Sequence, residues 1–142
     1  MTDDDTHVAF VCVQNAGRSQ MATAYAVRER EARGLTDAVV IHSGGTHPAD
    51  AVHDIVREAM AEEGIDLSQR ESQHISEETL ESCDYVATMG CSTLSLEAET
   101  DVRDWDLPDP HGEELETVHE IREEIRTRVE SLFDEFEATR DQ

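Results

Sequence analysis

Apolar and polar positions follow two alternating periods along this chain of 142 residues. Short apolar runs have the length of a buried strand, and longer stretches have apolar residues at three- and four-residue steps, as an amphipathic helix does. The strand-like runs are 7–12, 38–43, 84–89 and the more polar 101–105. The helical stretches are 18–33, which Gly34 stops, 51–64, which Gly64 closes, 115–136, and a short helix opened by the N-cap candidate Ser76.

Strands that alternate with helices predict an α/β fold with a parallel sheet and right-handed crossovers. Ligands of such sheets bind beyond the carboxyl ends of the strands, and Cys12 ends the first run. The length suits one domain over residues 1–142, with frayed ends expected at 1–6 and 138–142. A site near Cys12 is therefore the first place to look for chemistry.

Arg18 follows Cys12 by six positions and opens the first helical stretch. Successive backbone N–H groups of a tight loop before a helix converge on a tetrahedral anion, and the helix dipole adds about half a positive charge. The guanidinium of Arg18 matches two oxygens of phosphate or arsenate. We therefore expect an oxyanion site formed by Val13, Gln14, Asn15, Ala16, Gly17, Arg18 and Ser19.

Cys12 is the candidate nucleophile, since the same electrostatic field favours the thiolate, which is the reactive form of cysteine. The hydroxyl of Ser19 can donate a hydrogen bond to that thiolate. Spacing alone is weak evidence, because chance gives such a Cys–Arg pair in roughly one chain in five of this composition. The alternative is a buried cysteine at a strand end and a solvated arginine.

The segment from Cys12 to Ala22 resembles the phosphate-binding loop of the low-molecular-weight protein tyrosine phosphatase superfamily. Within it, the run Arg18 to Ala22 is similar to the arsenate reductase branch. Further similar blocks, in the order of the family, are Ser43 to Ala49, Glu63 to Ser68, Ala87 to Cys91 and Asp104 to Pro110. The resemblance implies a three-layer, doubly wound fold with four parallel strands in the order 2-1-3-4.

The resemblance also implies an enzyme without a cofactor. The first expectation is an arsenate reductase in which Cys12 attacks arsenate and an external thiol, or a thioredoxin- or glutaredoxin-like protein, is the reductant. The alternative is a phosphatase that hydrolyses phosphotyrosine or small aryl phosphates through a cysteinyl-phosphate. A third hypothesis is a module that binds phosphate or arsenate without turnover.

Asp109 matches the acid loop of the family, because it stands directly before Pro110. The leaving oxygen needs a proton in the transition state, and a carboxyl group can supply it. Asp106 is the runner-up for this role. Tyrosine phosphatases of the superfamily usually carry tyrosines after the Asp-Pro pair, whereas this chain has His111 and Gly112. This departure favours a smaller substrate such as arsenate.

Cys91 matches the first of two relay cysteines in the thioredoxin-linked reductases, but Ser95 stands near the place of the second. Cys83 is no substitute, because an extended strand separates it from Cys91 by roughly 25 Å, far beyond disulfide reach. We expect Cys83 to be a packed residue. The working hypothesis is a Cys12–Cys91 disulfide that an external thiol opens directly, and the alternative for Cys91 is an ordinary loop thiol.

Metal binding is not expected, since no histidine pairs with a cysteine at a usual zinc spacing. Some thioredoxin-linked members bind potassium near the loop through an asparagine, a glutamate, a serine and an aspartate. Thr23 stands at the place of that glutamate here, which puts such a site in doubt.

The balance of acidic and basic residues indicates the salt conditions in which the protein works and excludes some classes of partner. The chain has 11 basic residues, all arginine, against 34 acidic ones, a net charge of −23. Molar salt shortens the Debye length to about 3 Å and removes most of the self-repulsion, so we expect a halophilic source. The alternative, an acidic disordered protein, is not expected because apolar periodicity extends along the chain. Nucleic acid and membrane partners are not expected, since no basic cluster, long apolar run or signal peptide occurs, which predicts a cytoplasmic protein.

Overall fold

The computed structural model describes residues 6–12, 17–45, 52–67, 72–89, 101–105, 107 and 113–140. One sheet contains β1 (Thr6–Cys12), β2 (Val39–Gly45), β3 (Tyr85–Met89) and β4 (Asp101–Asp104). Its order is β2-β1-β3-β4, and every neighbouring pair is parallel. The helices are α1 (Arg18–Ala32), α2 (Asp54–Ala61), α3 (Glu77–Glu81) and α4 (Leu115–Arg140). The predicted parallel sheet and its strand order are confirmed.

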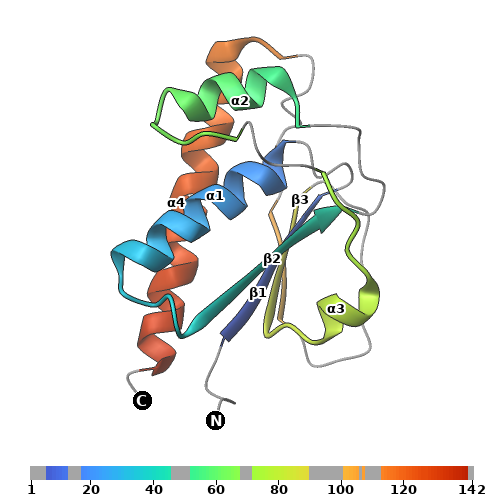
Figure 1. Ribbon diagram of the computed structural model, residues 1–142, viewed down its shortest axis with the longest axis vertical. Coiled ribbons are helices and arrows are strands. Elements are labelled where there is room, and N and C mark those ends of the chain that lie inside the picture. The colour runs from blue at the N-terminus through green and yellow to red at the C-terminus, as the bar shows by residue number, and fades with distance from the viewer. Residues whose placement is uncertain are drawn as a thin grey trace.

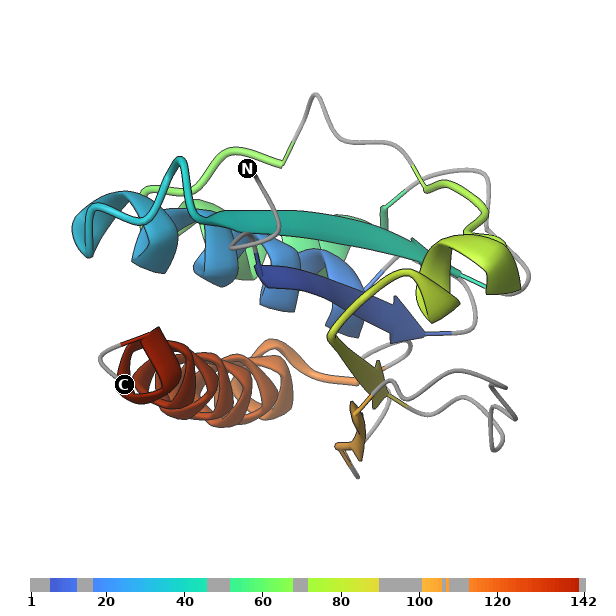
Figure 2. The same cartoon turned by 90° about the horizontal axis from the view of Figure 1, so that it is seen from below.

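The helices make two outer layers of unequal thickness around the sheet. Helices α1 and α4 cover one face, α2 packs on α4, and the short α3 lies over the other face (Figures 1 and 2). Successive side chains of β1 point to opposite faces of the sheet and so pack into the two layers, because strand side chains have a period of two. Phe10 and Cys12 join the large core with α1 and α4, whereas Ala9 and Val11 join the small one with Leu80 of α3. The expected three layers are therefore present.

Glycine ends the first two helices as predicted. Gly34 and Gly64 have φ values of 70° and 76°, in the left-handed region that glycine adopts without steric cost. Helix α2 is shorter than the apolar pattern over 51–64, since it begins at Asp54. The apolar pattern therefore begins before the helix, with the buried Val52.

Regular secondary structure extends closer to both ends of the chain than the sequence predicts. β1 includes Thr6, and α4 continues to Arg140, so residue 6 and residues 138–140, expected as frayed, belong to a strand and a helix. The last turn of α4 lies beyond the final apolar position of its pattern. None of the helices within the described ranges has the length and hydropathy needed to cross a membrane.

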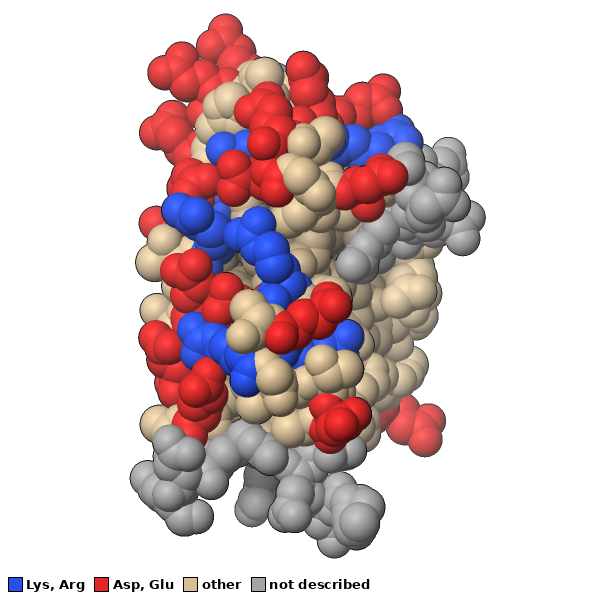
Figure 3. Space-filling view, turned by 60° about the vertical axis from the view of Figure 1, so that its left-hand side comes forward, with Lys and Arg blue, Asp and Glu red and all other residues tan. Residues whose placement is uncertain are grey.

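Arginines join the helices on the α1 and α4 side, where acidic and basic side chains interleave (Figure 3). Arg33 of α1 contacts Asp134 and Glu137 of α4 at 2.9 and 3.0 Å. Arg122 of α4 is 8% exposed and donates to the carbonyl of Ala59 in α2 at 2.7 Å. These contacts hold α1 and α2 against α4 and so keep the first turn of α1 at a constant place beside the sheet.

Candidate active site

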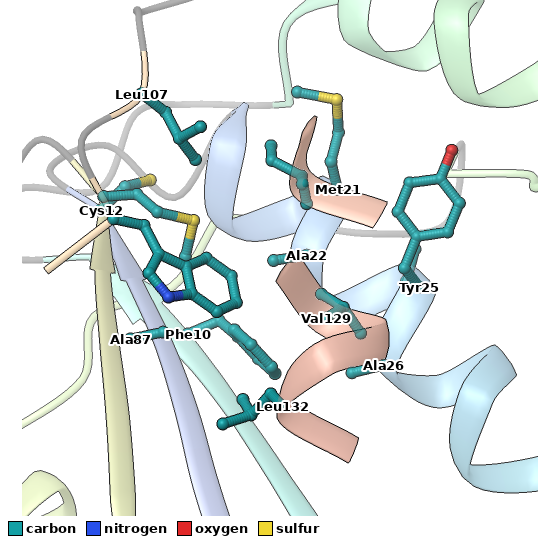
Figure 4. Close-up of a cluster of buried hydrophobic side chains, with 14 of the residues drawn as sticks. Phe10, Cys12, Met21, Ala22, Tyr25, Ala26, Ala87, Leu107, Val129 and Leu132 are labelled. Carbon is teal, nitrogen blue, oxygen red and sulfur yellow. The ribbon is translucent and has the colours of Figure 1, made fainter. Parts of the chain in front are cut away.

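Cys12 is the last residue of β1 and lies at the carboxyl edge of the sheet. Its register partners are Gly45, the last residue of β2, and Met89, the last residue of β3. The side chain is 3% exposed and sits at one end of the large apolar core, near Leu107 (Figure 4). The position predicted for Cys12, at a strand end where ligands of parallel sheets bind, is confirmed.

Helix α1 begins at Arg18, six positions after Cys12. Its N-cap is Gly17, which has no side chain to occupy the N–H groups of the first turn. The carbonyl of Gly17 accepts the first helical hydrogen bond from the N–H of Met21 at 3.0 Å. The first turn contains no acidic residue. The positive end of the helix dipole is therefore directed toward the carboxyl edge without a nearby carboxylate of its own turn to neutralise it.

Ser19 connects this helix end to the thiol. Its Oγ lies 2.8 Å from the Sγ of Cys12, and the Ser19 residue is fully buried. The Oγ1 of Thr23 donates to the carbonyl of Ser19 at 2.7 Å. A hydroxyl that donates to a thiolate stabilises the negative charge on sulfur. The contact agrees with the hydrogen bond predicted from the sequence and places a hydroxyl beside the buried sulfur.

Arg18 reaches a segment that is distant in sequence. Its Nη1 donates to the carbonyl of Leu107 at 2.9 Å, across 89 positions. Leu107 is 5% exposed and belongs to the large core. Its role was missed from the sequence, although an apolar residue between Asp106 and Pro108 is a signal for a buried anchor. Arg18 is thus tied to the segment that leads to Asp109, two residues further along the chain.

Several of the predicted site residues lie outside the described ranges, and their roles stay predictions. Cys12, Gly17, Arg18 and Ser19 are described. The others are Val13, Gln14, Asn15 and Ala16 of the loop, Asp109 with its alternative Asp106, and Cys91.

Cys83 occupies a different environment at the opposite end of the sheet. It is 4% exposed, belongs to the small core, and its Sγ donates to the carbonyl of Thr79 at 3.3 Å. Burial, with a smaller contribution from the charge of Asp84, raises the pKa of the Cys83 thiol to about 11. Cys83 is therefore the packed residue that the sequence predicted, and its raised pKa favours the neutral thiol.

Trp105 directly follows β4 and has a packing role. It is 7% exposed and its ring lies 5.9 Å from that of Phe10.

Within the described part of the chain, no group of three or more histidine, cysteine or acidic residues is placed to hold a metal ion.

Comparison with known proteins identifies relatives that align with nearly the whole length of the chain. Residues 7–142 match the model of the family "Low molecular weight phosphotyrosine protein phosphatase". A Halobacterium salinarum protein named "Putative arsenate reductase" is 64% identical over 135 residues, which are 94% of this chain and 95% of that protein.

Two solved structures are similar in fold and sequence. The Corynebacterium glutamicum thioredoxin-dependent arsenate reductase has a TM-score of 0.80 and 30% identity, and 98% of this chain is covered. This chain spans 65% of that protein, which is less than two thirds of its length. An arsenate reductase in its phosphate-binding state has a TM-score of 0.76 and 28% identity, with 92% of this chain and 98% of that one covered. The chain belongs to the low molecular weight phosphotyrosine protein phosphatase family.

Proposed function

We propose that this protein is an arsenate reductase, with Cys12 as the nucleophile and residues 13–19 as the oxyanion loop. The observation that carries the proposal is the 2.8 Å contact between the Sγ of Cys12 and the Oγ of Ser19, at the start of α1. A thiol with a hydroxyl partner at a helix N-terminus, on the carboxyl edge of a parallel sheet, suits attack on a bound anion. The 64% identical relative, named as an arsenate reductase, supports the choice of substrate.

The proposed reaction starts with an adduct on Cys12. Its thiolate forms a bond to arsenic, and one arsenate oxygen leaves as water with a proton that Asp109 delivers. The thiolate of Cys91 then attacks the sulfur of Cys12. A disulfide forms, the sulfur–arsenic bond breaks, and its electron pair reduces arsenic(V) to arsenic(III). Overall, one arsenate and two thiols yield one arsenite, one disulfide and one water.

The reductant must return two electrons and two protons to the disulfide. Met89 is the register partner of Cys12, and Cys91 follows it by two residues, which supports an approach of the two thiols. We propose that a small thiol or a thioredoxin- or glutaredoxin-like protein opens the disulfide directly. The thioredoxin dependence of the similar Corynebacterium enzyme supports a protein dithiol.

Asp109 is the proposed proton donor. The hydrogen bond from Arg18 to the carbonyl of Leu107 ties the start of the acid segment to the residue that would bind the anion. A guanidinium with several donors can contact that carbonyl and an anion together. Arg18 would then fix the distance between the anion and the proton source.

A phosphatase is the second candidate, and the description of the family itself favours it. In this case Cys12 forms a cysteinyl-phosphate, a phenolate or alkoxide leaves with the proton of Asp109, and water breaks the sulfur–phosphorus bond. Its substrates would be phosphotyrosine or small aryl phosphates. The first step is the same in both reactions, so the fate of the adduct decides between them.

Steady-state assays separate these functions. Arsenite release is measured with added dithiothreitol or thioredoxin, and hydrolysis of p-nitrophenyl phosphate is measured in parallel. Thiol-dependent arsenite release supports the reductase, fast ester hydrolysis without it supports the phosphatase, and anion binding with neither activity leaves a sensor module. In a reductase, Cys91→Ser abolishes arsenite release and spares ester hydrolysis, whereas Cys83→Ser spares both. Loss of both activities in Cys91→Ser would contradict the separate role of Cys91.

We also propose that the enzyme works in a salt-rich cytoplasm. The net charge of −23 and the acidic surface in Figure 3 support this setting. Self-repulsion is screened when the Debye length falls to about 3 Å in molar salt. We expect thermal unfolding to move upward by more than about 10 °C between dilute buffer and about 3 M KCl. An unchanged melting temperature would contradict the salt adaptation.

A further inference from the structure

A pocket of about 540 Å³ opens beside β2, the edge strand of the sheet. Figure 1 shows β2 between α1 on one side and α3 on the other, and residues of α1, of β2 and of the segment 73–79 line the pocket. Its size is typical of sites for small molecules. Neither Cys12 nor Arg18 is among its described lining residues, so the pocket is distinct from the candidate active site.

The lining differs in charge from the rest of the chain. Arg30, His42 and His74 contribute cationic or titratable groups, and hydroxyl and amide side chains supply further hydrogen-bond partners. No described lining residue is acidic, although the chain has 34 acidic residues against 11 basic ones. A concave site with basic groups and low-dielectric walls concentrates positive potential. The pocket is therefore suited to an anion.

Arg30 has a hydrogen-bond donor for which the described residues supply no acceptor. Its Nη1 donates to the carbonyl of Val39 at 3.2 Å, whereas its Nε is buried and has no hydrogen-bond partner among them. A buried donor without an acceptor is costly, so an acceptor from a ligand would stabilise it. Arg30 also forms no ion pair with a described carboxylate. The arginines that do form one are Arg33, Arg57, Arg103, Arg122, Arg126 and Arg128.

His42 adds a group whose charge can respond to a ligand. Its Nε2 lies 3.2 Å from the Nδ1 of His7, and the two rings are stacked. Burial, followed by the charge of His7, lowers the pKa of His42. The carboxylate of Asp84 accepts the backbone N–H of His7, and Arg30 and His74 complete the charged and titratable surroundings among the described residues. An anion in the pocket would favour the protonated form of His42 and raise its pKa.

We propose that the pocket along β2 is a second anion site, which binds a small organic molecule through a carboxylate or phosphate group held by Arg30 and His42. This site is independent of the proposed reductase chemistry, because the residues that form it are not those of the oxyanion loop.

The test uses nuclear magnetic resonance of the full chain in about 1 M KCl, where weak surface attraction is screened. The probe is 3-phosphoglycerate, which carries both groups, and inorganic phosphate and acetate serve as single-group probes. We expect saturable shifts of the amides of Ile41, His42 and Thr79. Shifts with phosphate alone assign a phosphate site, and shifts with acetate as well assign a general oxyanion site. Shifts confined to the first turn of α1 would overturn the proposal.

Arg30→Met and Arg28→Met form a matched pair on one helix. Arg28 is exposed, and its guanidinium stacks on Tyr25 at 4.8 Å, outside the lining. Loss of a charge-assisted hydrogen bond should weaken 3-phosphoglycerate at least about tenfold in Arg30→Met, against less than about twofold in Arg28→Met. Equal weakening in both variants would overturn the proposal.

A measurement on the unmodified chain avoids any loss of fold in Arg30→Met. Saturation with 3-phosphoglycerate should raise the pKa of His42 followed through its ring resonances. An unchanged pKa would overturn the proposal.

Discussion

Cys12 and Cys83 are both buried, at 3% and 4% exposure, yet they lie at opposite edges of the sheet and contact different groups. Cys12 ends β1, contacts the hydroxyl of Ser19 and lies beside the first turn of α1. Cys83 precedes β3, donates to the carbonyl of Thr79 in α3, and has its pKa raised to about 11. The hydroxyl of Ser19 contacts the first sulfur, whereas the second contacts the carbonyl of Thr79 and the side chain of Ser82.

The contrast shows that two thiols of similar burial have different neighbours because they lie at opposite edges of a parallel sheet. In β–α units, each strand runs toward the N-terminus of the next helix, so N–H donors and positive dipole ends gather at the carboxyl edge. Helix C-termini, which present carbonyl groups, gather at the opposite edge. Cys12 lies at the edge where helix N-termini gather, and Cys83 lies at the edge where helix C-termini gather.

The largest effect is expected when each sulfur is removed. Cys12→Ser should lower kcat/KM for arsenate by more than about 10³-fold, because the reaction loses its nucleophile. Cys83→Ala should leave kcat/KM within about twofold and reduce only stability, as a small cavity does. Steady-state kinetics of both variants tests this contrast. Similar losses of activity in the two variants would contradict the assignment of Cys12.

Arg18→Lys should lower kcat/KM about 10²-fold. Lysine keeps the charge but loses the planar fork for the anion and the geometry of the contact with the carbonyl of Leu107. Arg28→Lys on the exposed side of the same helix is the control and should have nearly normal kinetics. Wild-type activity in Arg18→Lys would mean that the guanidinium contributes only its charge.

Ser19→Ala should slow alkylation of Cys12 by iodoacetamide at neutral pH about tenfold. The variant removes the hydroxyl that lies 2.8 Å from the sulfur and stabilises the thiolate. Mass mapping of the alkylated peptides distinguishes Cys12 from Cys83. Ser82→Ala, beside Cys83, should leave the Cys12 rate unchanged, and an equal rate in Ser19→Ala would remove Ser19 from the mechanism.

The smallest effect concerns alkaline stability. The pKa of Cys83 is raised from 9.0 to about 11, so the unfolded state loses its proton first as the pH rises. Bound protons are then fewer in the unfolded state, and this contribution to stability, complete below about pH 9, is lost toward about pH 11. Between about pH 8 and 9.7, wild type should lose about 1 kcal/mol more than Cys83→Ala in urea unfolding. An identical loss in both would place the Cys83 thiol in contact with water.

Much of the fold and the centre of the candidate site were predictable because their signals are local. The apolar periods located the strands and helices, and the glycines at 34 and 64 marked two helix stops. Cys12 at a strand end and Ser19 in the following helix turn are only seven positions apart, so their contact follows from short-range geometry. The short α2 was predicted too long, since apolar residues beyond a helix can also face the core.

The amino-acid pattern by itself determined the alternation of elements, the parallel sheet and the place of Cys12 at a strand end, because each depends on neighbours within one or two turns of chain. Only the tertiary structure decided that Arg18 contacts Leu107 and that Arg30 and His42 share a pocket. Such contacts depend on strand order and helix packing, which bring together side chains whose separation in sequence carries no periodic signal.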